Sequence, residues 1–559
     1  MRPIRSLIDL LRERAATMPD RPAYTFLNDG ETVGASTTWG ELERRSRAIA
    51  VAISSRVEPS SRVLVMFPPS LDFVPAFFGA IYAGAIAVPA YPPAGARADR
   101  VLSRLKGMIG DAGVELVLAP RAVMSAGVPA LECLSWLDPA DVPDNLADEW
   151  RVPKVTGESI AFLQYTSGST SSPRGVMVSH RNLLHNLSAA AADGGYDEES
   201  LSISWLPISH DMGLINGVLQ PAFSGFGAYL MAPAAFLQRP ARWLQAISRL
   251  GATHSGGPNF AYDLCVRRVS DDDCATLDLG GWRVAYNGSE PVRRSTLEGF
   301  QRRFGPRGFR WETFSPAYGL AESTLLVANV PAGVAPVVRG DMVASGLVTS
   351  ATRILIVDPS TRGRLPDGAT GEIWVAGDSV ACGYWNRDEE TRSTFCAHTL
   401  DGDGPFLRTG DLGAVHDGGL FVTGRIKDVL IVRGVKHYPQ DLELCAERSH
   451  PALRPGGCAA VALDRGEEER IAIIAEVDPR ELSRGTVVDL QQMVIAIRVA
   501  VASAHHVSLF SVALVQPGSL PKTTSGKLQR YLCREGLVKG TLESITTWTA
   551  DSCADQVAS

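Results

Sequence analysis

The 559-residue chain lacks the features that mark membrane-spanning, secreted and nucleic-acid-binding proteins. No run of 18 apolar residues occurs, so no segment is long enough to cross a bilayer as a helix. Residues 1–14 alternate charged and apolar side chains and lack the unbroken apolar core of a signal peptide. Basic and acidic residues nearly balance, 54 against 61, which predicts neither a nucleic-acid partner nor a polybasic membrane contact. We therefore expect a cytoplasmic protein.

Cysteine pairing is also missing. The nine cysteines are scattered, with no Cys-x-x-Cys pair and no Cys/His cluster at zinc spacing. Such a set is typical of reduced, buried thiols, so we expect no structural metal. The hydrophobic share of 45% and the charged share of 21% are ordinary for a globular protein. At this length one hydrophobic core is excluded, and several lobes are expected.

Short apolar strands alternate with helical segments through the first 300 residues. Strands are predicted at 62–67, 114–118, 160–165, 202–206 and 227–231, and helices at 71–87, 182–192 and 243–250. This alternation predicts an α/β fold with parallel sheets covered on both faces. Ligands of such folds bind outside the carboxyl ends of the strands.

The pattern changes after about residue 340. Strands at 353–357, 371–377 and 419–424 predict a small β-rich lobe, a distorted barrel. A compact α+β unit is expected beyond it, with strands at 428–432, 458–463 and 471–477 and helices at 439–449 and 487–502. The predicted domains are therefore 1–424 and a mobile 425–546, followed by a disordered tail at 547–559.

The segment Tyr165-Thr-Ser-Gly-Ser-Thr-Ser-Ser-Pro-Arg-Gly-Val-Met177 is the strongest single signal of chemistry. Its glycines, hydroxyls and free amide groups can form a pocket for anionic oxygen. It does not match the common phosphate loop, which needs Gly, four residues and then Gly-Lys-Ser/Thr. A solvated Ser/Gly turn without a ligand is the alternative.

Four further segments carry polar residues in a fixed order. They are Ser315-Pro-Ala-Tyr-Gly-Leu-Ala-Glu-Ser-Thr324, Leu407-Arg-Thr-Gly-Asp-Leu-Gly413, Val422-Thr-Gly-Arg-Ile-Lys-Asp-Val-Leu-Ile431 and Leu520-Pro-Lys-Thr-Thr-Ser-Gly-Lys-Leu-Gln-Arg530. With the first segment they resemble the adenylate-forming superfamily of acyl-CoA synthetases, adenylation domains and luciferases, from about residue 10 to 535. The stretches 204–214, 287–293 and 436–443 are most similar to the fatty acyl-AMP ligases.

The resemblance implies an ATP- and Mg²⁺-dependent enzyme that converts a fatty acid into acyl-AMP and then transfers the acyl group to a thiol. It implies phosphate contacts from Thr166, Ser167, Gly168, Ser169, Thr170 and Arg174, where arginine replaces the more usual lysine. It further implies contacts with AMP from Gly288, Ser289, Glu290, Ala317, Tyr318, Gly319, Leu320, Asp411 and Arg425. In the family, the tyrosine stacks on adenine and the aspartate bonds the ribose hydroxyls.

The same resemblance implies the catalytic and metal-binding positions. Glu322 matches the Mg²⁺-binding glutamate, with Thr166 as a hydroxyl ligand. Lys527 matches the lysine of the mobile loop that acts during adenylation, and Lys427 matches the hinge. The catalytic set is completed by Arg425 and by His210, near the carboxylate. Gly213, Gly257 and Phe260 are assigned to the acyl pocket, and Gly256-Gly257-Pro258 offers no counter-ion for an α-amino group.

Several alternatives stay open. Taken alone, Arg174 could be a solvated surface charge, Tyr318 a core tyrosine, Asp411 a turn residue, and the acyl-pocket residues part of the core. The same alternative holds for Lys527, but Pro521 and Gly526 in its loop argue against it. The implied acceptor is the phosphopantetheine thiol of an acyl carrier protein on a separate chain. Because the segment 327–353 is shorter than the family insertion that disfavours CoA, a fatty acyl-CoA ligase is the alternative. An inactive scaffold homologue is the remote one.

Overall fold

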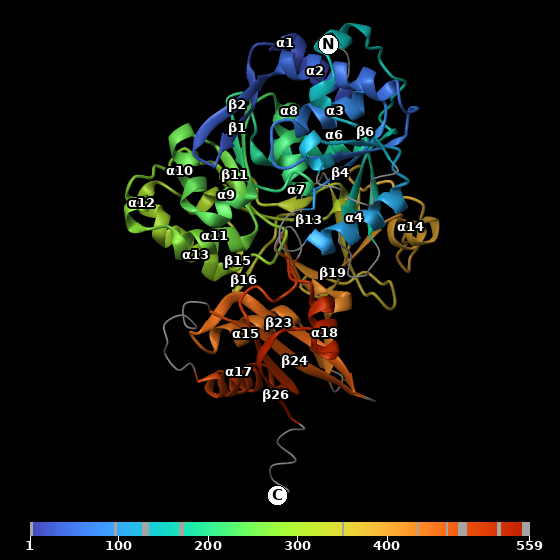
Figure 1. The fold of residues 1–559 in the computed structure, drawn as a ribbon. Helices are drawn as coiled ribbons and strands as arrows, with labels where there is room; N and C mark the ends of the chain where they lie inside the picture. The colour runs from blue at the N-terminus through green and yellow to red at the C-terminus, as the bar shows by residue number, and fades with distance from the viewer. Residues whose placement is uncertain are drawn as a thin grey trace, which may run out of the picture. The chain divides into compact units, whose positions relative to one another are not determined.

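The computed structural model describes residues 4–93, 98–125, 134–166, 173–348, 352–432, 435–465, 468–478, 489–522 and 527–550. The chain divides into two compact units, described one at a time below. The first comprises residues up to 409 together with 414–422. The second comprises 410–413 together with the residues from 423 on. The predicted α/β fold with a C-terminal α+β part is confirmed (Figure 1).

A six-stranded sheet carries the Ser/Gly loop. Its strands are, in spatial order, β6 (Ser135–Leu137), β5 (Leu116–Leu118), β3 (Arg62–Met66), β4 (Ile86–Ala90), β7 (Ile160–Thr166) and β8 (Arg174–Ser179). All neighbours pair in parallel except β7 and β8, which form an antiparallel hairpin. Helix α3 (Phe73–Tyr82) packs on α2 (Trp39–Ser54), where a Cβ on Gly79 would lie 2.5 Å from Ile49. The absence of a side chain at Gly79 therefore lets these two helices pack closely.

An eight-stranded sheet forms the other half of the first unit. Its order is β14 (Leu326–Asn329), β13 (Phe314–Gly319), β12 (Val284–Asn287), β11 (His254–Gly257), β9 (Leu201–Ser204), β10 (Gly227–Met231), β1 (Pro22–Asn28) and β2 (Thr32–Thr38). Only the two edge pairs are antiparallel. One large core joins residues of both sheets, and a second core gathers aromatic side chains under the longer sheet.

Helices cover these sheets (Figure 1). Besides α2 and α3, the first 125 residues of the chain form the helices α1 (Leu7–Thr17), α4 (Ala98–Ala112) and α5 (Arg121–Ser125). Along the rest of the first unit they are α6 (His180–Gly194), α7 (Asp211–Leu214), α8 (Gln220–Ser224), α9 (Pro233–Gln238), α10 (Ala241–Leu250), α11 (Asn259–Arg268), α12 (Asp271–Ala275), α13 (Arg294–Phe304) and α14 (Asp388–Phe395). The side chains of Ser179 and Asn182 form a capping box that fixes where α6 begins.

The predicted β-rich region contains β15 (Val338–Arg339) paired with β16 (Met342–Val343). It also contains a four-stranded sheet of β17 (Arg353–Val357), β18 (Gly371–Ala376), β19 (Leu407–His416) and β20 (Gly419–Arg425). The second unit has the hairpin β21 (Leu430–Val432) and β22 (Val435–His437). Its main sheet orders β23 (Leu453–Arg465), β24 (Glu468–Val477), β25 (Ser511–Val515) and β26 (Ser544–Thr549), with α15 (Pro439–Arg448), α17 (Leu490–His505) and α18 (Arg530–Lys539).

Two local expectations were wrong. The helix predicted at 71–87 ends at Tyr82, because Gly84 takes a φ of +70° and the chain then enters β4. Residues 547–549 belong to β26, which pairs with β25, so this part of the tail is ordered as a strand. Strand β8, which the sequence analysis did not predict, lies between the Ser/Gly loop and α6. In the part of the chain that the structure describes, no helix is both long and apolar enough to span a membrane.

Candidate active site

The Ser/Gly loop begins and ends on a hairpin. Thr166 at the end of β7 pairs with Arg174 at the start of β8. A Cβ on Gly175 would lie 2.9 Å from the ring of Tyr165, so only glycine lets the two strands meet here. The predicted phosphate-binding residues Ser167, Gly168, Ser169 and Thr170 lie outside the described residues.

Arg174 belongs to a chain of charged groups at the base of this loop. Its Nε lies 2.9 Å from Oε2 of Glu390, and its guanidinium lies over the ring of Tyr384, 5.4 Å from the centroid. Glu390 also pairs with Arg387 at 3.1 Å, and Arg387 pairs with Asp111 at 2.9 Å. Arg174 is thus held at the loop and compensated by a carboxylate, so it is not a loose surface charge.

Glu322, the predicted metal ligand, lies in a short 3₁₀ turn that follows β13. Its Oε1 accepts a hydrogen bond of 2.8 Å from the hydroxyl of Tyr384. Burial of Tyr384 and the neighbouring Glu322 carboxylate both raise the pKa of that phenol, so the hydroxyl remains a donor. No described group of three His, Cys, Asp or Glu side chains is arranged to hold a metal ion. One carboxylate at a phosphate site nevertheless suits Mg²⁺, which takes most of its ligands from phosphate and water.

The segment Gly288–Glu290 follows β12 and approaches β13 closely. A Cβ on Gly288 would lie 2.9 Å from the carbonyl oxygen of Ala317, so glycine is required at this contact. Ser289 has a φ of +70°, a sparsely populated conformation for a non-glycine residue. Oε1 of Glu290 accepts a 2.5 Å hydrogen bond from the main-chain N–H of Phe260. This hydrogen bond therefore links Glu290, a predicted nucleotide-binding residue, directly to Phe260, a predicted acyl-pocket residue.

Tyr318 lies within strand β13. Its side chain is buried, with 8% exposed, in the core shared by both sheets of the first unit. A Cβ on Gly319 would lie 1.8 Å from the carbonyl oxygen of Leu325, where β14 returns against β13. Leu320 then caps the turn that carries Glu322.

Asp411 and Arg425 contact each other. Nε of Arg425 lies 2.8 Å from Oδ1 of Asp411, and the carboxylate is buried while the guanidinium is half exposed. Asp411 lies in strand β19 and not in a turn. The two predicted ribose-binding groups thus come from neighbouring strands of one sheet.

His210 and Gly213 lie at the start of a helical stretch, α7, which continues as a π-helical turn at Ile215–Leu219. Nδ1 of His210 lies 2.6 Å from Oδ1 of Asp211, and the ring caps the helix. A Cβ on Gly213 would lie 2.1 Å from the carbonyl oxygen of Pro207. Because π-turns concentrate at functional sites, this irregular helix agrees with a role for His210.

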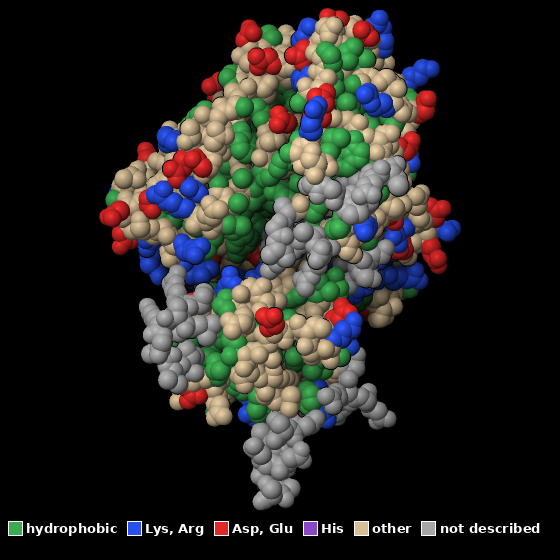
Figure 2. Space-filling model, in the orientation of Figure 1, with side chains coloured by type: hydrophobic (Ala, Val, Ile, Leu, Met, Phe, Trp, Pro, Cys, Tyr) green, Lys and Arg blue, Asp and Glu red, His purple; other side chains and the backbone are tan. Residues whose placement is uncertain are grey.

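The predicted acyl pocket is packed with aromatic rings. A Cβ on Gly257 would lie 2.5 Å from the indole of Trp205. That indole stacks on Phe236 at 4.1 Å and meets Phe260 edge to face at 6.1 Å. Figure 2 shows hydrophobic side chains gathered on the face of this unit that is turned to the viewer. Sequence reasoning assigned no role to Trp205, although this residue lies within the stretch 204–214 that includes His210.

In the second unit, Lys527 follows the undescribed residues 523–526 and precedes α18. A bridge between Lys522 and Leu528 brings the two sides of this loop together. Lys427, the predicted hinge residue, lies in a 3₁₀ turn at Ile426–Asp428 and is exposed.

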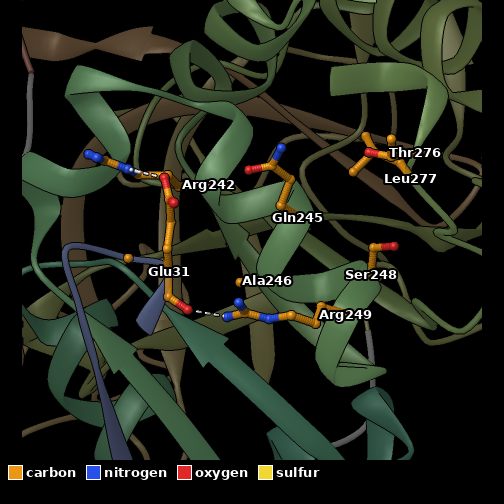
Figure 3. A pocket seen from close by; sticks show the side chains of 9 residues that line it. Glu31, Arg242, Gln245, Ala246, Ser248, Arg249, Thr276 and Leu277 are labelled. Carbon is orange, nitrogen blue, oxygen red and sulfur yellow. Dashed lines mark hydrogen bonds and ion pairs between the residues drawn. The ribbon is translucent and has the colours of Figure 1, made fainter. Parts of the chain in front are cut away.

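A cavity of about 340 Å³ lies away from all of these residues, between the β1–β2 turn and α10 (Figure 3). Glu31 bridges Arg242 at 2.9 Å and Arg239 at 3.1 Å there, and its main-chain oxygen accepts from Arg249. None of the predicted site residues lines this cavity. Because Glu31 already compensates its cations, we interpret the cluster as an ionic tie between hairpin and helix.

Tyr384, Glu390, Arg387 and Asp111 were missed by sequence reasoning. Tyr384 contacts Glu322, and Glu390 contacts Arg174; both contacts join residues that are 62 or more positions apart in the sequence. Arg387 and Asp111 extend the same chain of ion pairs. No local spacing signals such partners. Only the folded sheet, in which Val176 bridges Tyr384, brings them together.

Comparisons with known proteins define the class. The family model "AMP-binding enzyme" matches residues 11–385, and the model "Disco-interacting protein 2-like, AMP domain" matches residues 427–547. The first match alone covers more than half of the chain. The chain therefore belongs to the AMP-binding enzymes, and the predicted resemblance is confirmed.

Individual relatives narrow the class. The chain is 43% identical over 570 residues to the medium-chain-fatty-acid–[acyl-carrier-protein] ligase JamA of Moorena producens, with 96% of each chain covered. It is 36% identical to the long-chain-fatty-acid–AMP ligase FadD23 of Mycobacterium tuberculosis, covering 94% of this chain and 96% of the relative. A fatty acyl-adenylate ligase of L. pneumophila, solved with acyl adenylate and pyrophosphate, is 37% identical with a TM-score of 0.75. That match covers 97% of this chain and 98% of the other.

Proposed function

We propose that this enzyme activates a fatty acid with ATP and passes the acyl group to the phosphopantetheine thiol of a separate acyl carrier protein. The observation that carries the proposal is the 43% identity to JamA, an acyl-carrier-protein ligase, over 96% of both chains. In the first step a carboxylate oxygen bonds to the α-phosphorus and the bond to the β-phosphate breaks, releasing pyrophosphate. In the second step the thiol sulfur bonds to the acyl carbon, AMP leaves, and the thiol loses its proton.

The first step joins two anions at a crowded phosphorus, so its barrier depends on charge compensation and orientation. Arg174 is positioned by Glu390 and Tyr384 beside the end of the Ser/Gly loop. We assign it to the phosphates, which a planar guanidinium can bind through two parallel hydrogen bonds. Binding would exchange Glu390 for phosphate, and the arginine would remain compensated throughout.

Mg²⁺ fits the residues at this site. Glu322 would hold the ion through its carboxylate, with the hydroxyl of Thr166 as a second protein ligand. Bound there, the ion supplies positive charge to the phosphates. Tyr384 fixes the orientation of Glu322 through the 2.8 Å hydrogen bond.

The nucleoside contacts follow from residue chemistry. Asp411 is an acceptor-only carboxylate, which suits the two donor hydroxyls of a ribose. Arg425 already lies against this carboxylate, so it is placed to bond the same sugar and its phosphate. We assign adenine to the ring of Tyr318, with Ser289 and Glu290 at the border of the nucleotide.

Lys527 is the proposed principal catalyst of adenylation. Its compact ammonium would place a positive charge where negative charge accumulates as the carboxylate meets the α-phosphate. Rotation about Lys427 would bring this lysine in for the first step and remove it for the second.

A fatty acid is the proposed substrate because the residues around the predicted acyl-pocket positions Gly257 and Phe260 are apolar and aromatic. Trp205, Phe236 and Phe260 supply hydrophobic contact area, and no carboxylate in the segment 256–262 is available to pair with an amino group. Among the residues that the structure describes, the cavity next to Leu206 and Ile208 has a volume of only about 10 Å³. An acyl chain would therefore have to move these side chains to enter.

The proposal is tested by ATP–pyrophosphate exchange with a series of linear fatty acids, followed by mass spectrometry of the adenylates. A phosphopantetheine-loaded acyl carrier protein and CoA are then offered in parallel reactions. We expect exchange with fatty acids and acyl transfer to the carrier. Transfer to CoA alone would identify a fatty acyl-CoA ligase, and no exchange with any fatty acid would overturn the proposal.

A further inference from the structure

Arg530 is a largely buried cation of the second unit to which the sequence analysis assigned no role. It begins α18, three residues after Lys527. Its Nε and Nη2 lie 2.7 and 2.8 Å from the two oxygens of Glu443 in α15. Its Nη1 lies 3.0 Å from Oδ2 of Asp428, directly after the hinge residue Lys427. One guanidinium therefore joins three elements: the hinge turn, α15 and the end of the lysine loop.

The three side chains of this ion-pair network are largely buried. The side chain of Glu443 is 9% exposed, and those of Arg530 and Asp428 are 23% and 24% exposed. Burial alone would lower the pKa of the Arg530 guanidinium, but Glu443 and then Asp428 raise it, so the charge is retained. Breaking a buried ion pair by removing one partner is far more costly than losing a surface pair.

The other side of the lysine loop is also fixed. Oε1 of the buried Glu476 accepts the main-chain N–H of Leu520 at 3.0 Å, and Oε2 pairs with Arg454 at 2.6 Å. The main-chain N–H of Gln529 donates to the carbonyl of Pro521 at 2.9 Å and closes the loop base. Both ends of the loop are therefore held to the body of the second unit. The Asp428–Arg530 contact links this body to the turn that contains Lys427.

We propose that Arg530 is a positioning residue that couples the hinge turn to the loop carrying Lys527, so that rotation at Lys427 moves the lysine as part of a rigid body. This inference rests on the proposed function, in which Lys527 acts in adenylation. Glu443 anchors the coupling: its Oε1 also accepts the main-chain N–H of Ala460 in β23 at 3.0 Å. Asp428 transmits it, since its carboxylate is the partner on the hinge side.

The test uses Asp428→Asn, which keeps the shape of the side chain and removes its charge, and Arg530→Lys, which keeps the charge but cannot bridge both carboxylates. Adenylation is measured by ATP–pyrophosphate exchange, and the second step by transfer from supplied acyl-AMP. We expect adenylation to fall about 10- to 100-fold in both variants, as for a misplaced catalytic group. Transfer, which does not use Lys527, should fall much less. Equal losses in both steps would overturn the proposal.

A double-mutant cycle with Lys527→Ala separates positioning from general damage. If Asp428 acts through Lys527, Asp428→Asn should leave the residual adenylation of Lys527→Ala unchanged. If Asp428→Asn lowers adenylation in the Lys527→Ala variant by the same factor as in the wild type, the coupling is refuted. If Lys527→Ala itself leaves adenylation intact, the proposed function of Lys527 fails, an outcome distinct from failure of the coupling.

Thermal unfolding supplies the structural control. Glu443→Gln breaks the anchor inside the unit, so it should lower the melting temperature more than Asp428→Asn does. Arg498→Gln, which removes a cation lying 3.6 Å from the ring centroid of Trp548 in the same unit, should leave the ratio of the two half-reactions unchanged. A shifted ratio in Arg498→Gln would count against a specific role for Arg530.

Discussion

Replacing Tyr384 by Phe removes a single hydroxyl from the proposed metal-binding group. That hydroxyl donates to Oε1 of Glu322 over 2.8 Å, and the tyrosine is 4% exposed. The ring itself packs against Phe395 and lies under the guanidinium of Arg174, and Phe preserves both contacts. The change is therefore confined to the orientation and electrostatics of one carboxylate.

The expected magnitude follows from the type of bond. A hydrogen bond to a charged group contributes about 1.5–3 kcal/mol, more than one between neutral groups. At about 1.4 kcal/mol per factor of ten, this is about a 10- to 100-fold loss in kcat/KM for adenylation. Partners that orient metal ligands show losses of about the same size on mutation.

The assay is ATP–pyrophosphate exchange at saturating fatty acid while Mg²⁺ is titrated. We expect the Mg²⁺ concentration at half-maximal rate to rise in Tyr384→Phe and high Mg²⁺ to restore part of the rate. Tyr24→Phe is the matched control, because that buried hydroxyl donates to the carbonyl of Val218 and touches no proposed ligand. An unchanged Mg²⁺ requirement in Tyr384→Phe, or the same shift in Tyr24→Phe, would refute the reasoning.

Lys527→Ala should reduce adenylation to a small residual rate yet leave transfer from supplied acyl-AMP largely intact, and equal loss of both steps would contradict the role assigned to this lysine. Burial lowers the pKa of His180 from 6.5 to about 4. The unfolded chain therefore binds a proton that the folded chain does not, and about 3 kcal/mol of stability should be lost as pH falls from 6.5 to 4. Denaturant titrations should show this slope reduced in His180→Gln. Gly319→Ala should lower the melting temperature by the equivalent of about 1–3 kcal/mol, since its Cβ would lie 1.8 Å from the carbonyl of Leu325, whereas Gly281→Ala has open space and should not.

The fold was predictable where a segment is apolar over its whole length. Strands β3, β7 and β10 lie within one residue of their predicted limits, because strands buried on both faces read as continuous apolar runs. The helix predicted at 71–87 failed for the same reason. Phe73–Tyr82 and Ile86–Ala90 are both fully apolar, and only the turn at Gly84 separates helix from strand.

Residues of the candidate site could be proposed from the sequence at positions that carry a family motif. Glu322, Asp411 and Lys527 were assigned from such motifs, and the structure adds a defined partner for the first two. Those partners were less visible. Tyr384 contacts Glu322 only because the segment after β18 folds back onto β8, a contact between positions 62 residues apart. Pairing of this kind depends on the whole sheet, so no sequence window contains it.

A common principle joins the proposed ligand-binding groups of the described chain: each is already paired with a group of complementary charge or polarity. Arg174 pairs with Glu390, Asp411 with Arg425, and Glu322 accepts from Tyr384. A buried charge without a partner would cost several kcal/mol, so these contacts preserve the site before substrate binds. The substrate must therefore compete with internal partners, and its net binding energy is the difference between the two sets of contacts.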